Sequence, residues 1–297
     1  VILSSLISVV IPFYEGKVWL LEAIKSVVNQ TYDNIEVFVV NDGSKEDVSD
    51  IIYFKHENIT LINKENGGAA SARNVGIEHS RGKYIAFLDS DDIWSHDKID
   101  KQFLYMEENQ LVWSQHSYYK FWQGESKREI VDTSMCFGDV YLDLFVSCKV
   151  QTSTVMVLRD VLISKNIRFP LDFRRGQDGE FYKDLAKHYK LGFVPDLFGG
   201  FRMRGANVGF SPKVLLLNKY QVWDKIKNDN FVLGKLPSLV KLGFRVNYLM
   251  CSFAIKMATK HTLSKKQEYY FFGLSYIVPY VIFKVCSLLY LRKNKHD

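Results

Sequence analysis

The sequence has few cysteines and no pattern that places them at a metal or redox site. Its 297 residues include four cysteines, with no C-x-x-C pair and no spacing typical of bound zinc. We therefore expect Cys136, Cys148, Cys251 and Cys286 to be buried thiols in a reducing compartment. No charged-then-apolar leader opens the chain, so no secretory signal is expected.

The common glycine-rich phosphate loops are also missing. No G-x-G-x-x-G follows the first expected strand, which disfavours a dinucleotide site, and no G-x-x-x-x-G-K-[ST] is present, which disfavours a P-loop. The uncharged run 269–283 holds 15 residues, fewer than the roughly 20 that a membrane-spanning helix needs. A spanning helix is therefore not expected from this run.

Positive charge is concentrated at the C-terminal end. The net charge is +6, and residues 260–297 supply +5 of it, from seven lysines and arginines against two acidic residues. The rest of the chain is therefore close to neutral. A basic tail beside a neutral body predicts contact with a local anionic surface and argues against a nucleic-acid groove along the protein.

Hydrophobic residues make up 47% of the chain and charged residues 24%, which is typical of a globular protein. Apolar β-prone segments alternate with segments of helical periodicity through about the first 90 residues. This alternation predicts an α/β fold with a mostly parallel sheet, helices on both faces and right-handed crossovers. The expected strands are 7–13, 35–40, 59–62 and 84–88, and the expected helices are 19–29, 45–53 and 69–79.

After residue 92 the pattern becomes less regular. The expected strands are 111–122, 152–158 and 198–203, and the expected helices are 98–108, 161–165 and 178–188. From Pro212 the chain is expected to be mostly helical, over 214–226, 236–260 and the uncharged run. The sequence therefore predicts an α/β body followed by a helical extension.

Three carboxylates stand within four residues directly after the buried strand 84–88. Asp89 and Asp91 alternate along the chain and can point the same way past the strand end. Acids this close repel each other unless a cation lies between them. Oxygen ligands favour Mg²⁺ or Mn²⁺, which commonly complete their shell with substrate phosphates. The alternative is a solvated acidic turn that caps the helix starting near Asp97.

A further acid and a glycine turn are expected at the same edge of the sheet. Asp42 follows the second strand, and Asn66-Gly67-Gly68 precedes the third helix. Because open parallel sheets bind ligands at the carboxyl ends of their strands, we expect these groups near Asp89 and Asp91. A nucleotide fits such a set, since acids can bind ribose and base donors and glycines let the backbone come close.

Four further charged residues have two interpretations each. Arg73 lies one helical turn past the glycine turn. It is either a phosphate or base contact, or an ordinary surface arginine. Asp178 begins a helix, where it is either a general base in the cleft or the N-cap of that helix. Arg202 and Arg204 lie on one side of a late strand. They either clamp a diphosphate or form a pair of charges at the edge of the sheet.

The C-terminal segment combines aromatic and basic residues. The uncharged run 269–283 is rich in tyrosine and phenylalanine, and positive charge flanks it on both sides. This pattern favours a helical pair that lies in a membrane surface. The alternatives are a hydrophobic helix packed on the α/β body or within a homo-oligomer.

Five segments in order over residues 7–92 resemble the successive signatures of family 2 glycosyltransferases with the GT-A fold. They are Val9-Val10-Ile11-Pro12-Phe13-Tyr14, Ser26-Val27-Val28-Asn29-Gln30-Thr31-Tyr32, Val40-Asn41-Asp42-Gly43-Ser44, Asn66-Gly67-Gly68-Ala69-Ala70-Ser71-Ala72-Arg73-Asn74-Val75-Gly76-Ile77 and Tyr84-Ile85-Ala86-Phe87-Leu88-Asp89-Ser90-Asp91-Asp92. The resemblance implies a Rossmann-like nucleotide-diphospho-sugar transferase fold. It also implies an inverting enzyme that takes a sugar from a nucleotide diphosphate, usually UDP, of the type that builds bacterial surface polysaccharides such as lipopolysaccharide, capsule or exopolysaccharide.

The resemblance assigns roles to individual residues. It implies that Asp42 binds the nucleobase, that Asp89 and Asp91 form the D-x-D motif for ribose and metal, and that Asp178 is the base. The other residues expected to bind the nucleotide sugar are Pro12, Tyr14, Glu15, Asn66, Gly68, Arg73, Ser90, Arg202 and Arg204. The implied cofactor is Mn²⁺ or Mg²⁺, held by Asp91 and Asp89.

Two positions depart from the family pattern. The usual acid pair is Gln177-Asp178 here, which loses the first acid and keeps the second, the usual base. The common late R-x-H is Arg202-Met203-Arg204, with arginine in the histidine slot. The histidine's metal or phosphate role is therefore open in this chain.

The lead hypothesis is a transferase that moves a sugar to a hydroxyl of a glycan or lipid-linked acceptor at the cytoplasmic face of the inner membrane. One alternative is a nucleotide-sugar-binding protein without activity, and another is an aspartate-nucleophile phosphatase, prompted by acids after a buried strand. Residues 1–211 are expected to form the catalytic domain, with a nucleotide half over 1–95 and an acceptor half over 96–211. Residues 212–297 are expected to form a helical, membrane-associating region.

Overall fold

The computed structural model describes residues 5–53, 58–146, 148–173, 176–204, 212–261 and 264–293. They form two compact units, which are described separately. The second unit contains Leu142–Cys148, Phe173–Gly176 and Gly205–Asp297, and the first contains the rest of the chain. The predicted boundary after residue 211 adjoins residues outside the described ranges. This boundary and the predicted halves 1–95 and 96–211 stay predictions.

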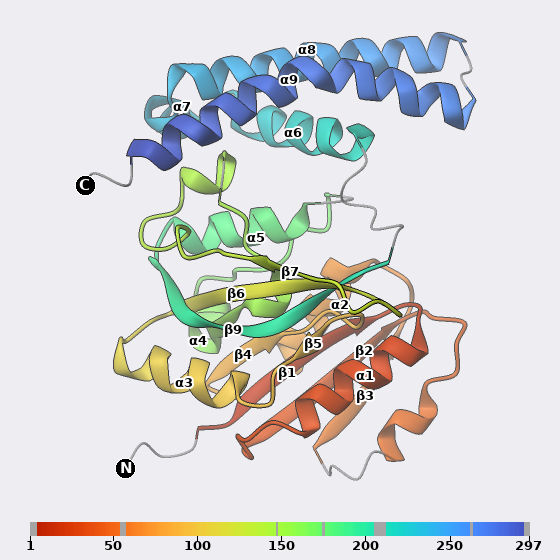
Figure 1. Cartoon of the computed structure of the whole chain (residues 1–297), viewed down its shortest axis with the longest axis vertical. Helices are drawn as coiled ribbons and strands as arrows, with labels where there is room; N and C mark the ends of the chain where they lie inside the picture. The colour runs from red at the N-terminus through yellow and green to blue at the C-terminus, as the bar shows by residue number, and fades with distance from the viewer. Residues whose placement is uncertain are drawn as a thin grey trace. The chain divides into compact units, whose positions relative to one another are not determined.

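Four parallel strands form one half of a nine-stranded sheet in the first unit (Figure 1). Their order is β3-β2-β1-β4, with β1 at Ile7–Phe13, β2 at Ile35–Asp42, β3 at Ile59–Lys64 and β4 at Tyr84–Phe87. All of β1 is buried, as expected for a strand with neighbours at both edges and packed faces. The predicted α/β fold with its parallel strands is confirmed.

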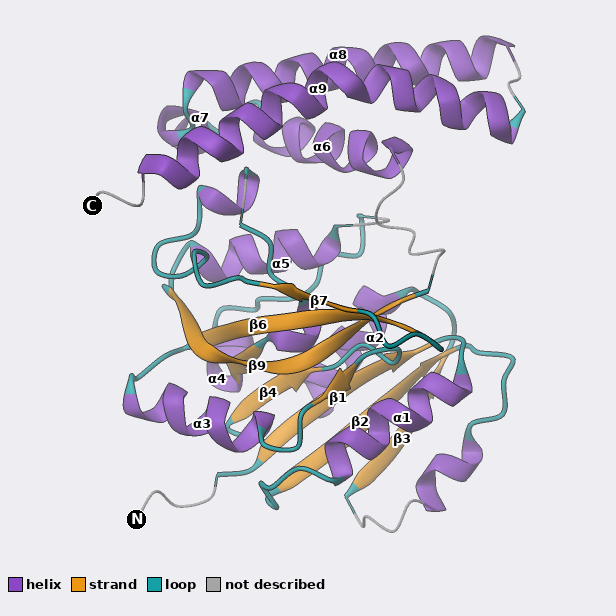
Figure 2. Cartoon of the chain, in the orientation of Figure 1, coloured by secondary structure: helices purple, strands orange, loops and turns teal. Residues whose placement is uncertain are grey.

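The helices α1 (Lys17–Val28) and α2 (Ala69–His79) cover opposite faces of these strands (Figure 2). The buried side of α1 shares a core with Val9 and Ile11 of β1. Val10 points to the other face, since side chains alternate along a strand. There it meets α2 so closely that a Cβ on Gly76 would lie 2.3 Å from Val10 Cγ1.

The prediction of a helix over residues 45–53 is wrong. Only Ser49–Tyr53 forms a short 3₁₀ helix, η1. Ser44 Oγ accepts a hydrogen bond from the Glu46 backbone N–H at 3.0 Å, as an N-cap side chain would, but no α-helix starts there. Polar residues after a strand compete locally for backbone donors in this way, which makes a turn look like a helix start.

The other half of the sheet is largely antiparallel. β8 (Met156–Leu158) pairs antiparallel with β4 and with β6 (Trp113–Trp122), while β9 (Leu191–Met203) runs parallel to β6. Two short strands, β5 (Ile93–Trp94) and β7 (Arg128–Val131), pair antiparallel with β9 and β6. The predicted start of the strand over residues 152–158 is wrong, because Thr152–Thr154 forms a 3₁₀ helix, η3.

Three helices pack on this half. They are α3 (Lys98–Glu108), α4 (Arg159–Ser164) and α5 (Gln177–Ala186). Phe181 of α5 stacks on Phe169 with ring centroids 4.0 Å apart and meets the edge of Phe87 of β4 at 5.8 Å. Aromatic stacking therefore fixes the start of α5 beside the end of β4, where the acids follow.

The second unit is helical. Its helices are α6 (Pro212–Ile226), α7 (Asn230–Lys235), α8 (Ser238–His261) and α9 (Lys265–Lys293). Leu216, Cys251, Ala254 and Phe272 form its fully buried core. The helix expected over 236–260 is wrong at its start, because Leu236 is the C-cap of α7 and Pro237 separates it from α8.

Within α9, one stretch is long and apolar enough to cross a membrane by length and composition, at Lys266–Leu289. At about 1.5 Å per residue its 24 residues span roughly 36 Å, against a hydrocarbon core of about 30 Å. The uncharged run 269–283 underestimates this stretch, because Val285, Leu288 and Leu289 continue it past Lys284.

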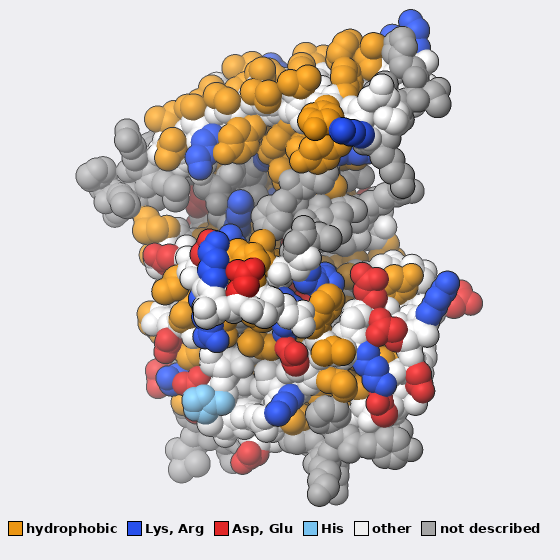
Figure 3. Space-filling view, turned by 45° about the vertical axis from the view of Figure 1, so that its right-hand side comes forward, with side chains coloured by type: hydrophobic (Ala, Val, Ile, Leu, Met, Phe, Trp, Pro, Cys, Tyr) orange, Lys and Arg blue, Asp and Glu red, His pale blue; other side chains and the backbone are white. Residues whose placement is uncertain are grey.

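One face of α9 is apolar and exposed. Residues 272, 275, 279, 283 and 286 are buried, while the exposed stripe on α9 consists of Tyr270, Leu274, Ile277, Val281, Val285 and Leu288. Figure 3 shows hydrophobic side chains gathered over the helical unit. Exposed apolar surfaces of this extent mark protein or membrane contacts.

The cysteines divide into two pairs. Cys251 and Cys286, in α8 and α9, are buried free thiols, as predicted. Cys136 and Cys148 are disulfide-bonded, so the prediction of four thiols is wrong for these two. Both lie in irregular segments.

Candidate functional site

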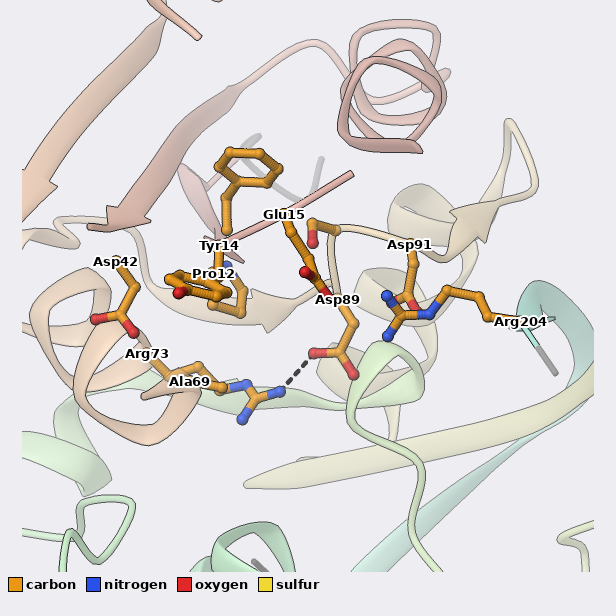
Figure 4. A pocket seen from close by; sticks show the side chains of 11 residues that line it. Pro12, Tyr14, Glu15, Asp42, Ala69, Arg73, Asp89, Asp91 and Arg204 are labelled. Atoms are coloured by element: carbon orange, nitrogen blue, oxygen red, sulfur yellow. Dashed lines mark hydrogen bonds and ion pairs between the residues drawn. The ribbon is translucent and has the colours of Figure 1, made fainter. Parts of the chain in front are cut away.

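A pocket of about 270 Å³ lies at the carboxyl ends of β1, β2 and β4 (Figure 4). It is lined by Pro12, Phe13, Tyr14, Glu15, Asp42, Ala69, Arg73, Asp89, Ser90, Asp91 and Arg204. Its volume is near the lower end of the roughly 300–1,000 Å³ typical of ligand pockets. In the order β3-β2-β1-β4 the chain changes direction between β1 and β4, and open sheets bind ligands at such a switch point.

Two arginines pair with the acids that follow β4. Arg73 of α2 donates from Nη2 to Asp89 Oδ1 at 2.5 Å. Arg204, directly after β9, lies with Nε 2.8 Å from Asp91 Oδ2. Figure 4 shows Arg73 directed at Asp89 and Arg204 beside Asp91. Protein cations therefore balance both acids of the D-x-D motif.

The third acid of this segment is structural. Asp92 is fully buried, and its Oδ2 accepts hydrogen bonds from Gln151 and Ser153 at 2.7 Å each. Burial raises the pKa of Asp92 well above its usual value, and the nearby Asp91 and Asp89 raise it further. Asp92 thus anchors the loop, while Asp89 and Asp91 face the pocket.

Asp91 is electrostatically strained in this pocket. Burial raises the pKa of Asp91 above its ordinary value, and repulsion from Asp89 adds to the rise. Arg204 and Arg202 act in the opposite direction. A carboxylate in this state gains from any further cation that reaches it.

Asp89 and Asp91 supply the hard oxygen donors that Mg²⁺ and Mn²⁺ prefer. Among the described residues, no three His, Cys, Asp or Glu side chains converge as a complete metal site. Two pocket carboxylates do fit an ion that takes its other ligands from phosphate and water. The chain therefore fits the implied cofactor as one part of a site shared with a substrate.

Asp42 has a second task besides lining the pocket. Its carboxylate accepts from Lys64 Nζ at 2.6 Å and from the backbone N–H groups of Gly67 and Gly68 at 2.9 and 2.7 Å. The Asn66 amide adds a longer contact of 3.3 Å. Asp42 therefore holds the glycine turn that starts α2, and its predicted role in base binding stays a prediction.

Gly68 has a backbone that favours glycine. Its φ is +86°, a left-handed value that side-chain-bearing residues rarely adopt, and its N–H points to Asp42. The turn places Ala69 at the pocket wall and Arg73 one helical turn further on. Gly68 and Asn66 do not line the pocket themselves, so they shape it through Asp42.

Asp178 lies in the first turn of α5, one residue past the helix start, and is partly buried. Burial raises the pKa of Asp178, the Arg73 guanidinium lowers it and the Asp89 carboxylate raises it. These interactions show that Asp178, Arg73 and Asp89 belong to one electrostatic cluster. Asp178 does not line the pocket itself, and its role as base stays a prediction.

Arg202 is placed differently from Arg204. Its side chain is buried, with Nε 2.7 Å from the backbone oxygen of Asp91 and an ion pair from Nη2 to Glu22. Its guanidinium also lies 4.6 Å from the centre of the Phe121 ring. Arg202 is therefore outside the pocket lining, and the predicted clamp of Arg202 and Arg204 on a diphosphate stays a prediction.

The pocket brings together most of the predicted nucleotide-sugar and metal residues. Asn66, Gly68, Arg202 and Asp178 are the predicted residues that do not line it. Phe13 and Ala69 line it but were not predicted. Both adjoin predicted residues, Phe13 at the end of β1 and Ala69 at the start of α2, so their positions were the available signal.

Comparison with known proteins agrees with this geometry. The family model for "Glycosyl transferase family 2" matches residues 8–162, more than half of the chain. An uncharacterized glycosyltransferase of Rickettsia bellii is 38% identical over 80% of this chain and 34% of its own length. WfaP of Escherichia coli, named as a UDP-Glc:alpha-D-GlcNAc-diphosphoundecaprenol beta-1,3-glucosyltransferase, is 34% identical over 56% of this chain and 65% of its own.

The chain spans less than half the length of the first Rickettsia relatives that it matches. Two solved structures share its fold. Staphylococcus aureus TarS 1–349 with UDP-GlcNAc has a TM-score of 0.61 at 18% identity, covering 92% of this chain and 81% of that one. The mannosyltransferase PcManGT of Pyrobaculum calidifontis with GDP-Man and Mn²⁺ has a TM-score of 0.61 at 15% identity, covering 99% and 87%.

The predicted GT-A fold is thus confirmed, and the match removes the reason to consider a phosphatase. The family match begins within β1 and continues through the strand ends that build the pocket. The chain belongs to glycosyl transferase family 2.

Proposed function

We propose that this protein transfers a sugar, with inversion, from a UDP-sugar to a hydroxyl of a glycan or lipid-linked acceptor of a bacterial surface polysaccharide. One observation carries the proposal. The acids Asp42, Asp89 and Asp91 line a single pocket at the switch point of the sheet. Arg73 reaches the same pocket and interacts electrostatically with Asp178. The pocket therefore offers sites for base, ribose and diphosphate beside a candidate base.

Each pocket residue has a job in this reaction. Pro12 near the end of β1, with Tyr14 and Glu15 directly after it, offers an apolar and polar wall for the nucleoside. Arg73 and Arg204 offer guanidinium groups for the diphosphate, which arginine binds well. Asp89 and Asp91 are the residues that would hold Mn²⁺ or Mg²⁺, and such an ion offsets charge on a departing diphosphate.

Asp178 removes the proton from the acceptor hydroxyl in this proposal. A base near the operating pH is the most effective, and the raised pKa of Asp178 is a shift in that direction. A single base without an enzyme nucleophile predicts one displacement and inversion at the anomeric carbon, the logic that also holds for inverting glycosidases.

The donor and acceptor classes rest on similar proteins. WfaP is named for transfer from UDP-Glc to a GlcNAc-diphosphoundecaprenol acceptor. TarS has been solved with UDP-GlcNAc, and PcManGT with GDP-Man and Mn²⁺. These names support a UDP-sugar, a divalent metal and a lipid-linked acceptor as the first substrates to assay.

The test is UDP release from a panel of UDP-sugars with Mn²⁺ and an undecaprenyl-diphosphate-linked acceptor. Asp178→Asn is expected to lower the rate by about 10²- to 10⁴-fold, the usual contribution of general base catalysis. The matched control is Asp184→Asn, a partly exposed acid of the same helix paired with Lys187 at 2.8 Å. Equal rates for parent and Asp178→Asn remove Asp178 from the base role.

A nucleotide-sugar-binding protein without activity is the second candidate. It is favoured by Gln177, which stands where the family's first acid is usual. Its signature is UDP binding to the parent chain without turnover against any acceptor in the panel. Restoring the acid with Gln177→Glu then distinguishes a lost activity from a missing acceptor.

We also propose that α9 attaches the protein to the cytoplasmic face of the inner membrane. The apolar stripe on α9 is exposed, and lysines occur at Lys266 and Lys284 of the same helix. An apolar face with basic residues binds anionic membranes by burial and by charge. A homo-oligomer formed through the same stripe is the competing arrangement.

Sedimentation with vesicles containing phosphatidylglycerol tests the membrane proposal. Leu274→Glu, in the stripe, is expected to release the protein. Leu171→Glu is the matched control, because both leucines are about equally exposed, at 67% and 66%, and Leu171 lies in the other unit. If both variants still sediment with the vesicles and Leu274→Glu no longer forms a dimer, the stripe is an oligomer contact.

A further inference from the structure

Arg204 contacts both a pocket acid and an aromatic ring outside the pocket lining. Its Nε lies 2.8 Å from Asp91 Oδ2, and its guanidinium lies 5.2 Å from the centre of the Trp19 ring. A cation over an indole face gains free energy from the ring quadrupole, most strongly where water is partly excluded. Trp19 is not among the residues that line the pocket, so it acts on the pocket through Arg204.

Trp19 is itself fixed from two sides. Its Nε1 donates to Gln123 Oε1 at 2.7 Å, in the turn between β6 and β7. On the other side Gly16, with φ of +88°, lies so close that a Cβ there would be 2.4 Å from Trp19 Cε3. The ring is therefore a platform with a defined orientation.

The turn under this platform is also held. The backbone N–H groups of Gly16 and Lys17 donate to the Glu46 carboxylate at 2.6 and 2.8 Å. Gln123 and Gly16 thus adjoin the Trp19 ring, and Glu46 holds the backbone of the turn that contains Gly16. Such an arrangement fixes where the Arg204 guanidinium lies relative to Asp91.

Arg204 and a divalent ion compete for the same carboxylate. Asp91 Oδ2 is occupied by Arg204, and Asp91 is also one of the two acids that fit a metal. A second cation on this acid gains less while the arginine stays, because the two positive charges repel each other. Asp89 is paired in the same way with Arg73.

We propose that Arg204, held on Trp19, occupies the cation position at Asp91 when no donor is bound, and that an arriving metal ion displaces it towards the diphosphate. The inference rests on the proposed function, since the diphosphate belongs to the donor. It gives Arg204 two opposite effects: it opposes metal binding to the free protein and favours nucleotide binding once the metal is present. Trp19 is a positioning residue, because it acts only through Arg204.

The experiment measures two affinities of the full chain. Mn²⁺ binding without nucleotide is followed by the electron paramagnetic resonance of free Mn²⁺, and UDP binding at saturating Mn²⁺ is followed by calorimetry. Arg204→Gln is expected to tighten Mn²⁺ binding by roughly tenfold and to weaken UDP binding by a similar factor, a coupling of ordinary size. Arg204→Lys, which keeps the charge, is expected to stay closer to the parent.

Trp19→Leu tests the platform. It is expected to tighten Mn²⁺ binding less than Arg204→Gln does, and to have no further effect in an Arg204→Gln background, since coupled residues are not additive. Arg128→Gln is the matched control, because Arg128 also lies over a ring, Tyr119 at 4.7 Å, but does not line the pocket. It is expected to leave both affinities unchanged.

The outcomes separate the inference from the proposed function. Unchanged or weaker Mn²⁺ binding by Arg204→Gln, or a full effect of Trp19→Leu in the Arg204→Gln background, overturns the inference even if UDP binds. Tighter Mn²⁺ binding by Arg204→Gln in a protein that does not bind UDP supports the competition at Asp91 and overturns the proposed donor. Absence of Mn²⁺ binding in both parent and Arg204→Gln overturns the inference as well.

Discussion

Asp178 and Asp42 are two acids of one site with different surroundings. Asp42 accepts two backbone N–H groups and Lys64, so its charge is satisfied by the protein. Asp178 is partly buried, and burial dominates the shift of its pKa. Asp42 therefore holds the glycine turn, and the raised pKa of Asp178 supports the proposal that Asp178 exchanges a proton.

The pH dependence of activity should show whether Asp178 is the general base. Its pKa is raised, so the base form is lost as the pH falls through a value above the ordinary 3.8. We expect the acid limb of the kcat profile above that value, and an Asp178→Asn variant without this limb. Because the raised pKa also means that ionised Asp178 lowers stability above pH 3.8, the same variant should have a higher Tm at pH 7. A lower Tm contradicts this.

His116 gives a second pH effect, on stability alone. It is fully buried, and burial together with the nearby Lys98 lowers its pKa from 6.5 to about 3. The unfolded chain then binds a proton that the folded chain does not, so the free energy of unfolding falls as the pH drops below 6.5. Between pH 6.5 and 5 the loss is about 2 kcal/mol.

Urea unfolding at pH 7 and pH 5 measures this loss. His116→Gln is expected to show a smaller difference between the two pH values than the parent. His188→Gln, at an exposed histidine of the same unit, is the control and should keep the difference of the parent. Equal pH dependence in the parent and His116→Gln would contradict the assignment.

At the scale of elements, α2 links the sheet to the site. The helix packs on β1 at Gly76, and it carries Arg73 into the pocket on its preceding turn. The antiparallel half contributes α5 with Asp178 and β9 with Arg204. Elements from both halves of the sheet therefore have to meet before the site exists.

Gly76→Ala tests the close approach of α2 and β1. The added Cβ meets Val10 Cγ1 and Cγ2 at 2.3 and 2.8 Å, on a buried central strand that cannot easily move. Overpacking of this kind costs about 1–3 kcal/mol, which we expect to exceed the roughly 1 kcal/mol gained by replacing a helical glycine. The measurement is chemical denaturation.

The matched control is Glu78→Ala, at an exposed position of the same helix. Its free energy of unfolding should stay close to that of the parent. Adding Val10→Ala to Gly76→Ala should recover part of the loss, since it removes the atoms in conflict. Additive losses in the double variant would locate the strain elsewhere.

At the scale of the whole molecule, a ligand should act on one unit. The described residues that line the pocket all belong to the first unit, and α6–α9 belong to the second. A donor that binds the folded state at a hundredfold excess over its Kd stabilises that state by about 2.7 kcal/mol. We expect UDP with Mn²⁺ to raise Tm and to slow hydrogen exchange around β1, β4 and α2, without an equal effect in α8.

Uridine is the matched control ligand, because it lacks the diphosphate that we propose Arg73 and Arg204 bind. It should shift Tm less than UDP at the same concentration. Equal shifts from uridine and UDP, or protection of both units alike, would place the diphosphate outside this pocket.

The sequence by itself determined the parallel half of the sheet and most of the pocket lining. Continuous apolar runs such as β1 are buried on both faces in a parallel sheet, and the polar residues after them must lie at its carboxyl edge. Asp42, Asp89 and Asp91 could therefore be predicted from local sequence alone. The spacing of residues 69–79 was likewise enough to predict α2, but it left the position of the Arg73 side chain open between the pocket and the surface.

Only the tertiary structure decided which charges meet. Arg202 and Arg204 are two residues apart, yet one pairs with Glu22 and the other with Asp91. Trp19 and Gln123 are 104 residues apart and share a hydrogen bond. The antiparallel pairing of β4 with β8 has the same origin. Contacts between residues far apart in the sequence depend on how helices and strands pack together. The local periodicity of hydrophobic residues carries no information on that packing.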